Sequence, residues 1–255
     1  MPTDLRGWLT YDDPAAGVVA RLVEHLQYTA GGVLLACLVG LPLGLLLGHL
    51  GRGGTVAINL ANVGRAVPTL GVVVLFAVSP LGATLLSLSI ALGLFALPVV
   101  LTNAYVGMRE VDRDAVEAAR GMGMSPGQVF RKVELPLAFP LVAAGVRSAV
   151  LQVLATAVLA AAVGGGGLGR FLIDGLGSQD YPQLQAGALI VAGLALVVEL
   201  LLALVQRAVD PGAGGRPLGG RSPATEVPVA ERVRSEGSRT GGSASEGGPG
   251  LGMAG

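Results

Sequence analysis

The sequence has little charge, a single cysteine and few aromatic residues, and each shortage excludes a class of protein. Charged residues make up 13% of the 255 residues, about half the share found in an ordinary soluble domain. Cys37 is the only cysteine, which excludes a disulfide framework and a thiolate metal cluster. His25 and His49 are isolated and have no second metal ligand at a suitable spacing. We expect no nucleic-acid partner, although the formal net charge of zero does not itself bear on this.

What the sequence does contain is apolar residues in long runs, and the mean hydropathy is +0.67. No formally charged residue occurs between Glu24 and Arg52, and none from Ala66 to Met108. A bilayer core about 30 Å thick is crossed by about 20 helical residues. The first run therefore fits one span and the second fits up to two. We predict an all-α integral membrane protein that lies in the lipid bilayer of the cytoplasmic (inner) cell membrane.

Turn residues and two later apolar runs divide the chain into five predicted spans. Ser79 to Gly82 has turn chemistry and splits the second uncharged run. The predicted spans cover about residues 28–50, 55–78, 83–106, 137–163 and 184–206. They form a membrane domain over 24–207, preceded by an N-terminal segment, 1–23. Residues 208–255 are rich in Gly, Ser, Pro and mixed charge and have no apolar run to bury, so we expect a disordered tail.

Lysine and arginine in the connections predict the orientation in the membrane. The segment between the third and fourth spans contains Arg109, Arg113, Arg120, Arg131 and Lys132. Connections on the opposite side contain only Arg6, Arg21 and Arg170. We therefore expect residues 109–136 and the C-terminus in the cytoplasm, and the N-terminus outside.

The segment 109–136 carries the signals of two short helices. Asp114 followed by Glu117 resembles a capping box and predicts a helix through about Met122. Gly121 and Gly123 weaken that helix and permit a bend.

A second start signal follows the bend. Ser125 is a suitable N-cap, Pro126 suits the first helical position, and Gln128 completes a capping box. Because a residue before proline is pushed out of the helical region, we expect this second helix to end at Leu135.

The same segment resembles the "EAA" loop of permease subunits of binding-protein-dependent ABC importers. The resemblance is carried by Glu117-Ala118-Ala119, then Gly123, then Val133-Glu134-Leu135-Pro136. Val133 stands where isoleucine is commonest, and every other position of the pattern matches. The order of the spans around the loop also fits, and the resemblance covers about residues 24–207.

The resemblance implies a mechanical role for the loop. A short coupling helix enters a groove on a separate ATP-binding subunit, so that closure of two such subunits tilts the membrane helices. The implied docking residues are Glu117, Ala118, Ala119 and Gly123, with Leu135 and Pro136 ending the element. The family further implies a second permease chain and an extracytoplasmic solute-binding protein. ATP is bound by the partner, so this chain is expected to need no cofactor and to catalyse no reaction.

Within the family, the sequence looks most like permeases for osmoprotectants such as glycine betaine, choline, carnitine or proline. This likeness rests on residues 63–70, 103–110 and 117–147. Methionine importers share the architecture and a similar glycine-rich stretch, here Gly164 to Gly169, and remain the alternative. The ten aromatic residues are scattered and predict no cage for a quaternary ammonium ion. Selectivity is therefore expected in the separate binding protein.

Three charges lie within predicted spans, where charged side chains usually face protein or water. Arg65 lines the passage or reaches toward the cytoplasmic surface. Arg147 and Glu199 lie at matching depths of the fourth and fifth spans, which favours an ion pair over substrate contact. An ion-coupled secondary transporter would use this pair for coupling and is the alternative from another class. The stretch from Gly164 to Arg170 lacks the ending of a phosphate-binding loop and predicts a flexible outer turn.

Overall fold

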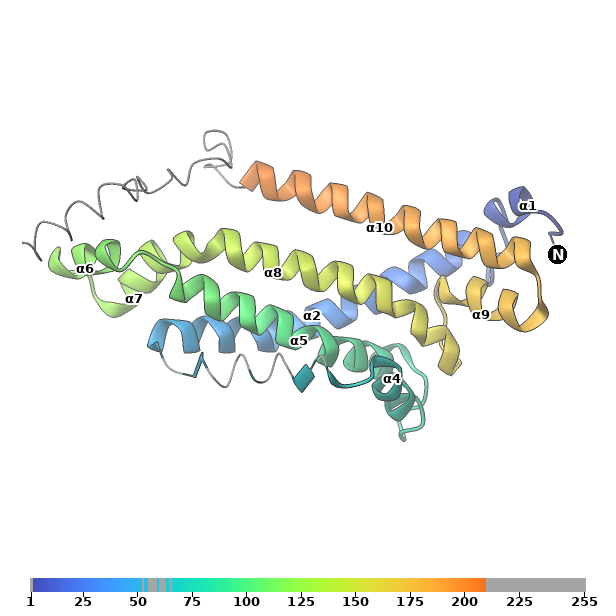
Figure 1. The fold of residues 1–255 in the computed structure, drawn as a ribbon, viewed down its shortest axis with the longest axis horizontal. Helices are drawn as coiled ribbons and strands as arrows, with labels where there is room; N and C mark the ends of the chain where they lie inside the picture. The colour runs from blue at the N-terminus through green and yellow to red at the C-terminus, as the bar shows by residue number, and fades with distance from the viewer. Residues whose placement is uncertain (1, 52, 55–58, 60–62, 65, 210–255) are drawn as a thin grey trace, which may run out of the picture. The chain divides into compact units, whose positions relative to one another are not determined.

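The computed structural model describes residues 2–51, 53–54, 59, 63–64 and 66–209, and over these the chain is a bundle of helices (Figure 1). Four helical stretches in this part are long and apolar enough to cross a membrane: Val18–Leu50, Leu85–Arg109, Pro126–Val163 and Tyr181–Ala208. The predicted all-α membrane fold is confirmed. Eight of the 24 residues of the predicted second span, 55–78, lie outside the described residues, and its later part forms helix α4 (Thr69–Ala77).

The helices differ from the predicted spans mainly by being longer. The membrane helices are α2 (Val18–Leu50), α5 (Leu85–Arg109), α8 (Leu135–Thr156) with its 3-10 extension η2 (Ala157–Val163), and α10 (Tyr181–Val209). Short helices are α1 (Leu5–Leu9), α6 (Arg113–Gly121), α7 (Pro126–Val129), the π-helical turn η1 (Phe130–Glu134) and α9 (Gly169–Ser178). The first two residues of the predicted tail, 208–255, belong to α10, and the rest of it lies outside the described residues.

The core of the bundle is the contact between α2 and α5. One face of α2 carries a small residue at every fourth position: Gly32, Ala36, Gly40, Gly44 and Gly48, all of them buried. Such a stripe lets two helix backbones approach closely, which is a common way to pack helices in a bilayer. A Cβ atom built on Gly44 would lie 2.5 Å from the Leu101 carbonyl oxygen of α5. Any side chain at position 44 would therefore separate the two helices.

α5 is the central helix, because it packs on α2, α4 and α8. It begins at the N-cap Thr84, whose hydroxyl accepts from the Ser87 N–H at 3.3 Å. Buried apolar residues, among them Leu88, Leu92, Ala96 and Val100, run along its length. In contrast, α2 and α10 expose many large apolar side chains, for example Leu38, Leu46, Leu196 and Leu200. Such surfaces suit lipid or a partner chain rather than water.

The two ends of the bundle are built differently. The loop with α6 and α7 lies at one end, and α1 and α9 lie at the other (Figure 1). At the latter end Trp8 is buried against Tyr11 and Phe171, with ring centroids 5.3 and 6.0 Å away. The expectation of scattered aromatic residues is therefore wrong for these three. Their edge-to-face packing fastens α1 to α9 and α10, a contact that no sequence spacing predicts.

Candidate functional site

The first helix of the loop, α6, presents two of the three residues of its Glu-Ala-Ala motif outward. Glu117 and Ala118 are exposed, whereas Ala119 is buried with Val116 against a small apolar cluster that includes Val129. Residues 117 and 118 are thus available to a partner. Ala119 instead fixes α6 to the bundle, so the structure does not place it on the proposed docking surface.

The predicted start of α6 is wrong by two residues. The N-cap is Asp112, whose carboxylate accepts from the Asp114 N–H at 2.9 Å. Asp114 lies in the first turn, where its negative charge complements the helix dipole. Asp112 accepts from a backbone N–H of the first turn that has no partner within the helix. It therefore takes the N-cap role that was predicted for Asp114.

Gly123 makes the bend between α6 and α7. Its φ is +83°, in the left-handed region, and its N–H donates to the Arg120 carbonyl at 2.9 Å. Nothing lies within 4 Å of the position of a Cβ atom on Gly123. Glycine is therefore required here by the backbone conformation and not by lack of space, since other residues pay about 1–2 kcal/mol to adopt it.

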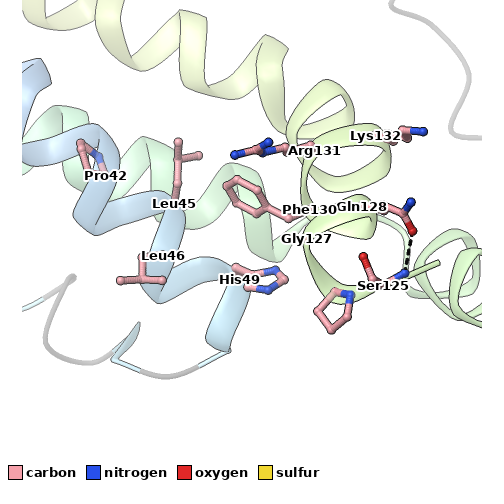
Figure 2. Close-up of a pocket in the computed structure, with 11 residues that line it drawn as sticks. Pro42, Leu45, Leu46, His49, Ser125, Gly127, Gln128, Phe130, Arg131 and Lys132 are labelled. Atoms are coloured by element: carbon pink, nitrogen blue, oxygen red, sulfur yellow. Dashed lines mark hydrogen bonds between the residues drawn. The ribbon is translucent and has the colours of Figure 1, made fainter.

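The second helix begins as predicted but does not end at Leu135. The Ser125 N–H donates to the Gln128 side-chain oxygen at 2.8 Å, and Pro126 occupies the first position (Figure 2). The chain then widens into the π-helical turn η1 and continues as α8, with Leu135 in helical conformation. Pro136 lies in the first turn of α8, directly after the widened π-helical turn, and the helical path continues through it.

A polar contact that the sequence did not predict fastens this turn to α2. The His49 imidazole, in the last turn of α2, contacts the carboxylate of Glu134 through Nδ1. Glu134 is only 2% exposed, and the His49 ring also packs edge-to-face on Phe130, with centroids 5.2 Å apart. A buried carboxylate requires such a partner. The end of α2 and the loop are therefore joined by a polar contact and by packing.

Within the bundle, the structure brings Arg147 and Glu199 together. The guanidinium of Arg147 on α8 forms an ion pair with the Glu199 carboxylate on α10, with Nε donating to Oε2 at 3.2 Å. A second N–H of Arg147 donates to the Gln206 side-chain oxygen at 3.1 Å. Arg147 thus bonds to both Glu199 and Gln206, and polar side chains within a membrane usually have such partners. Arg65, the other predicted intramembrane charge, lies outside the described residues.

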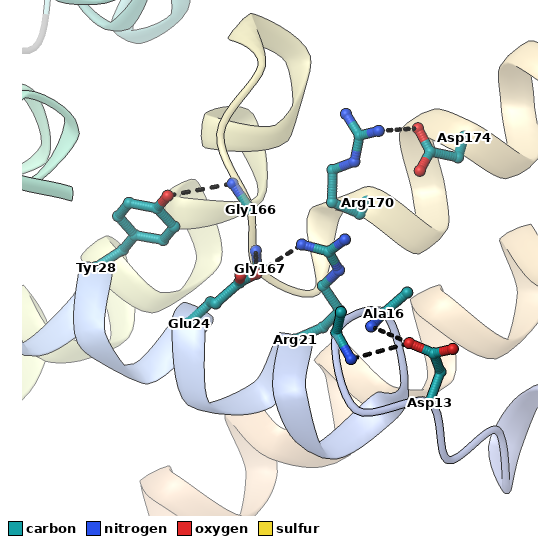
Figure 3. Close-up of polar contacts among 10 residues, drawn as sticks. Asp13, Ala16, Arg21, Glu24, Tyr28, Gly166, Gly167, Arg170 and Asp174 are labelled. Carbon is teal, nitrogen blue, oxygen red and sulfur yellow. Dashed lines mark hydrogen bonds and ion pairs between the residues drawn. The ribbon is translucent and has the colours of Figure 1, made fainter. Parts of the chain in front are cut away.

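At the opposite end, the glycine-rich stretch is held by α2 (Figure 3). The Gly167 N–H donates to the Glu24 carboxylate at 2.8 Å, and the Gly166 N–H donates to the Tyr28 hydroxyl at 3.1 Å. Glu24 also pairs with Arg21 at 2.8 Å. The sequence predicted a flexible turn, but these bonds tie the loop to the first long helix. In the sequence, only the position of Glu24 at the edge of the uncharged run could have suggested that α2 bonds to the glycine-rich stretch.

Long apolar helices joined by a helical polar loop between α5 and α8 are the arrangement that the resemblance to permeases of ABC importers implies. Residues 40–214 match the family described as binding-protein-dependent transport system inner membrane component, and the chain belongs to this family. The resemblance to permease subunits of ABC importers is thereby confirmed, and so is the reading of the chain as a transport component rather than an enzyme. In the part of the chain that the structure describes, no group of metal-binding side chains occurs.

Curated relatives and solved structures agree with this membership. The choline transport system permease protein OpuBB of Bacillus subtilis is 34% identical over 191 residues, covering 75% of this chain and 88% of the relative. The carnitine transport permease protein OpuCB of Listeria monocytogenes is 35% identical over 203 residues, covering 80% and 93%. A structure of the inward-facing MetNI methionine ABC transporter has a TM-score of 0.66 at 23% identity, covering 78% and 99%. That structural likeness shows the fold alone.

Proposed function

We propose that this chain is the permease for osmoprotectants, with quaternary ammonium solutes such as choline, glycine betaine and carnitine as its cargo. The observation that carries the proposal is the similarity to permeases named for these solutes, at 32–35% identity over most of both chains. The methionine alternative rests on a structural likeness at lower identity.

The loop over 109–136 is proposed as the docking element for one subunit of a pair of ATPase subunits, which bind the ATP. Exposed Glu117 and Ala118 on α6 offer a charged group and a small surface that allows close approach. The Gly123 bend sets the direction of α6, and Leu135 and Pro136 carry the loop into α8. Because η1 and α8 are continuous, a push on the loop would be transmitted along the whole of α8. A second permease chain and an outer solute-binding protein complete the proposed assembly.

The proposed orientation places the loop and the C-terminus in the cytoplasm and the N-terminus outside. Five of the lysine and arginine residues stand in the segment 109–136, and cytoplasmic connections are enriched in these residues.

Uptake into proteoliposomes tests the function. Vesicles that contain this chain, its ATPase and its binding protein are expected to accumulate radiolabelled choline or betaine when ATP is enclosed with the ATPase. Methionine should not accumulate. Uptake that follows a proton or sodium gradient without nucleotide would instead show a secondary transporter.

A charge reversal on α6 tests the docking element separately. Glu117→Lys is expected to abolish both ATP-driven uptake and copurification of the ATPase, because the exposed carboxylate is the proposed contact. Asp12→Lys is the matched control, since it makes the same charge change at an exposed position before α2, outside the loop. Retention of the ATPase by the Glu117 variant would overturn the docking assignment.

A further inference from the structure

A pocket of about 760 Å³ lies between the end of α2 and the loop that follows α6 (Figure 2). Its α2 wall is apolar and includes Leu45 and Leu46, and Phe130 adds an aromatic surface from η1. The pocket is therefore lined by one membrane helix and by the first turns of another.

The ionisable side chains of this pocket are basic, and Ser125 and Gln128 add neutral polar groups. His49, Arg131 and Lys132 line it, and no aspartate or glutamate does. The nearest acid, Glu134, is buried and already paired with His49. Arg131 extends from η1 toward Leu45 (Figure 2), and it forms no ion pair within the described ranges. A cation above apolar side chains suits an amphiphilic ligand, with an anionic group at one end and a hydrocarbon chain at the other.

We propose that this pocket binds an anionic phospholipid, with the phosphate on Arg131 and the upper acyl chain against Leu45 and Leu46, while Lys132 adds positive charge from the other side of η1. Basic pockets between transmembrane helices on the cytoplasmic side recognise anionic head groups. The pocket stands where α2 ends and α8 begins, which is the level of the head groups if the loop is cytoplasmic. Its volume far exceeds that of a free phosphate ion, and the apolar wall would leave such an ion unsatisfied.

The site has a consequence for transport, since its walls belong to the elements joined by His49 and Glu134. A lipid seated there would contact the end of α2 and the π-helical turn at once. It would brace the loop against α2 in the resting assembly. This inference goes beyond the proposed function, because it holds for whatever solute is carried.

The complex of this chain with its ATPase, purified in nanodiscs that contain phosphatidylglycerol and phosphatidylcholine, allows a direct test. After transfer to detergent, native mass spectrometry counts the retained lipids. The wild-type complex is expected to retain phosphatidylglycerol in preference to phosphatidylcholine. The double variant Arg131→Gln with Lys132→Gln is expected to bind it at least about tenfold more weakly, because the phosphate contact of Arg131 and the added charge of Lys132 are lost.

Two further variants separate a bound lipid from general charge and from misfolding. Arg113→Gln with Arg207→Gln removes the same charge from exposed positions outside the pocket, and it should retain the lipid. Leu45→Trp fills the apolar wall and keeps every charge, and it should exclude the lipid while the ATPase still copurifies. Millimolar inorganic phosphate should not displace the lipid, whereas displacement would assign the site to a soluble anion.

Equal retention of phosphatidylglycerol by the pocket variants and the control pair would overturn the proposal. Copurification of the ATPase is measured in the same samples. If the ATPase does not copurify with the wild-type chain, the proposed docking function is contradicted. The number of retained lipids would still show whether the pocket binds phosphatidylglycerol.

Discussion

His49 and Glu134, which are 85 positions apart in the sequence, meet at the junction of α2 with the loop before α8. The carboxylate is nearly fully buried and the imidazole is 21% exposed. No other side chain of the described residues bonds to this carboxylate. The contact makes the first long helix and the proposed docking loop one mechanical unit, so that movement of the loop would also move α2.

Removing one member of this pair should destabilise the fold because the other polar group is left buried and unpaired. We expect Glu134→Ala or His49→Ala to lower the free energy of unfolding by about 1–3 kcal/mol. The double variant should lose less unfolding free energy than the sum of the two single losses, by a coupling energy of about 0.5–3 kcal/mol. Unfolding in mixed micelles measures this, with exposed Glu110→Ala as the control. Strict additivity would show that the two side chains do not interact.

The α2–α5 contact should tolerate no side chain at Gly44. Gly44→Leu would push against the Leu101 carbonyl and the Ala104 side chain. Overpacking of this kind costs about 1–3 kcal/mol or more. Gly193→Leu is the matched control, since nothing lies within 4 Å of a Cβ atom at this exposed position of α10. The yield of monodisperse protein should fall for Gly44→Leu alone, and equal yields of the two variants would contradict the close packing.

The Arg147–Glu199 ion pair predicts rescue by exchange of the charges. Either single alanine variant leaves one charge in apolar surroundings, at a cost of about 2–3 kcal/mol. Arg147→Glu combined with Glu199→Arg should recover part of that loss and much of the uptake. If the exchanged pair transports no better than the single variants, the pair has a role other than structural pairing.

Glu24 and the glycine loop predict a steric rescue. A Cβ atom on Gly166 would collide with the Glu24 carboxylate. Gly166→Ala should therefore destabilise the wild-type chain, but much less when Glu24→Ala has removed the carboxylate. Gly177→Ala, where nothing lies within 4 Å, should have little effect in either background beyond its helix propensity. An undiminished cost of Gly166→Ala in the Glu24→Ala background would mean that the loop is not held as described.

The turn before α2 should weaken at low pH. Asp13 accepts from the Ala15 and Ala16 N–H groups at 2.9 and 2.8 Å (Figure 3), and these bonds lower the pKa of its carboxyl below the usual value. A lowered pKa means that the stabilisation is present above the usual pKa and is lost as the pH falls through the lower value. Amide exchange of Ala15 and Ala16, corrected for intrinsic rates, should show protection lost on acidification. Asp13→Asn should show a smaller dependence.

Much of this architecture was accessible from hydropathy, because lipid demands long apolar helices whatever their partners. Uncharged runs located the long helices, and the spacing of residues 117–136 identified the loop and the family. The capping signals of Ser125 and Pro126 were correct because caps depend on local bonds.

What the sequence could not predict depends on contacts between distant segments. The prediction that a helix ends before Pro136 failed because η1 widens the helix at that point, and this turn is held by His49 from α2. Likewise, Trp8 meets Phe171 only because α1 folds back on α9. The family resemblance implied Ala119 as a docking residue beside Ala118, but successive helical residues point in different directions, and the Ala119 side chain is buried against the bundle.

α6 is the proposed surface on which the ATPase docks. With Cys37→Ser as the background, Ala118→Cys places a single thiol at an exposed position of α6, and Gly177→Cys places one at an exposed position of α9, at the opposite end. A short bifunctional maleimide added to the assembled complex should join Ala118→Cys to the ATPase subunit and leave Gly177→Cys free of it. If the transport-competent complex gave no crosslink from position 118, or an equal one from position 177, docking on α6 would be contradicted.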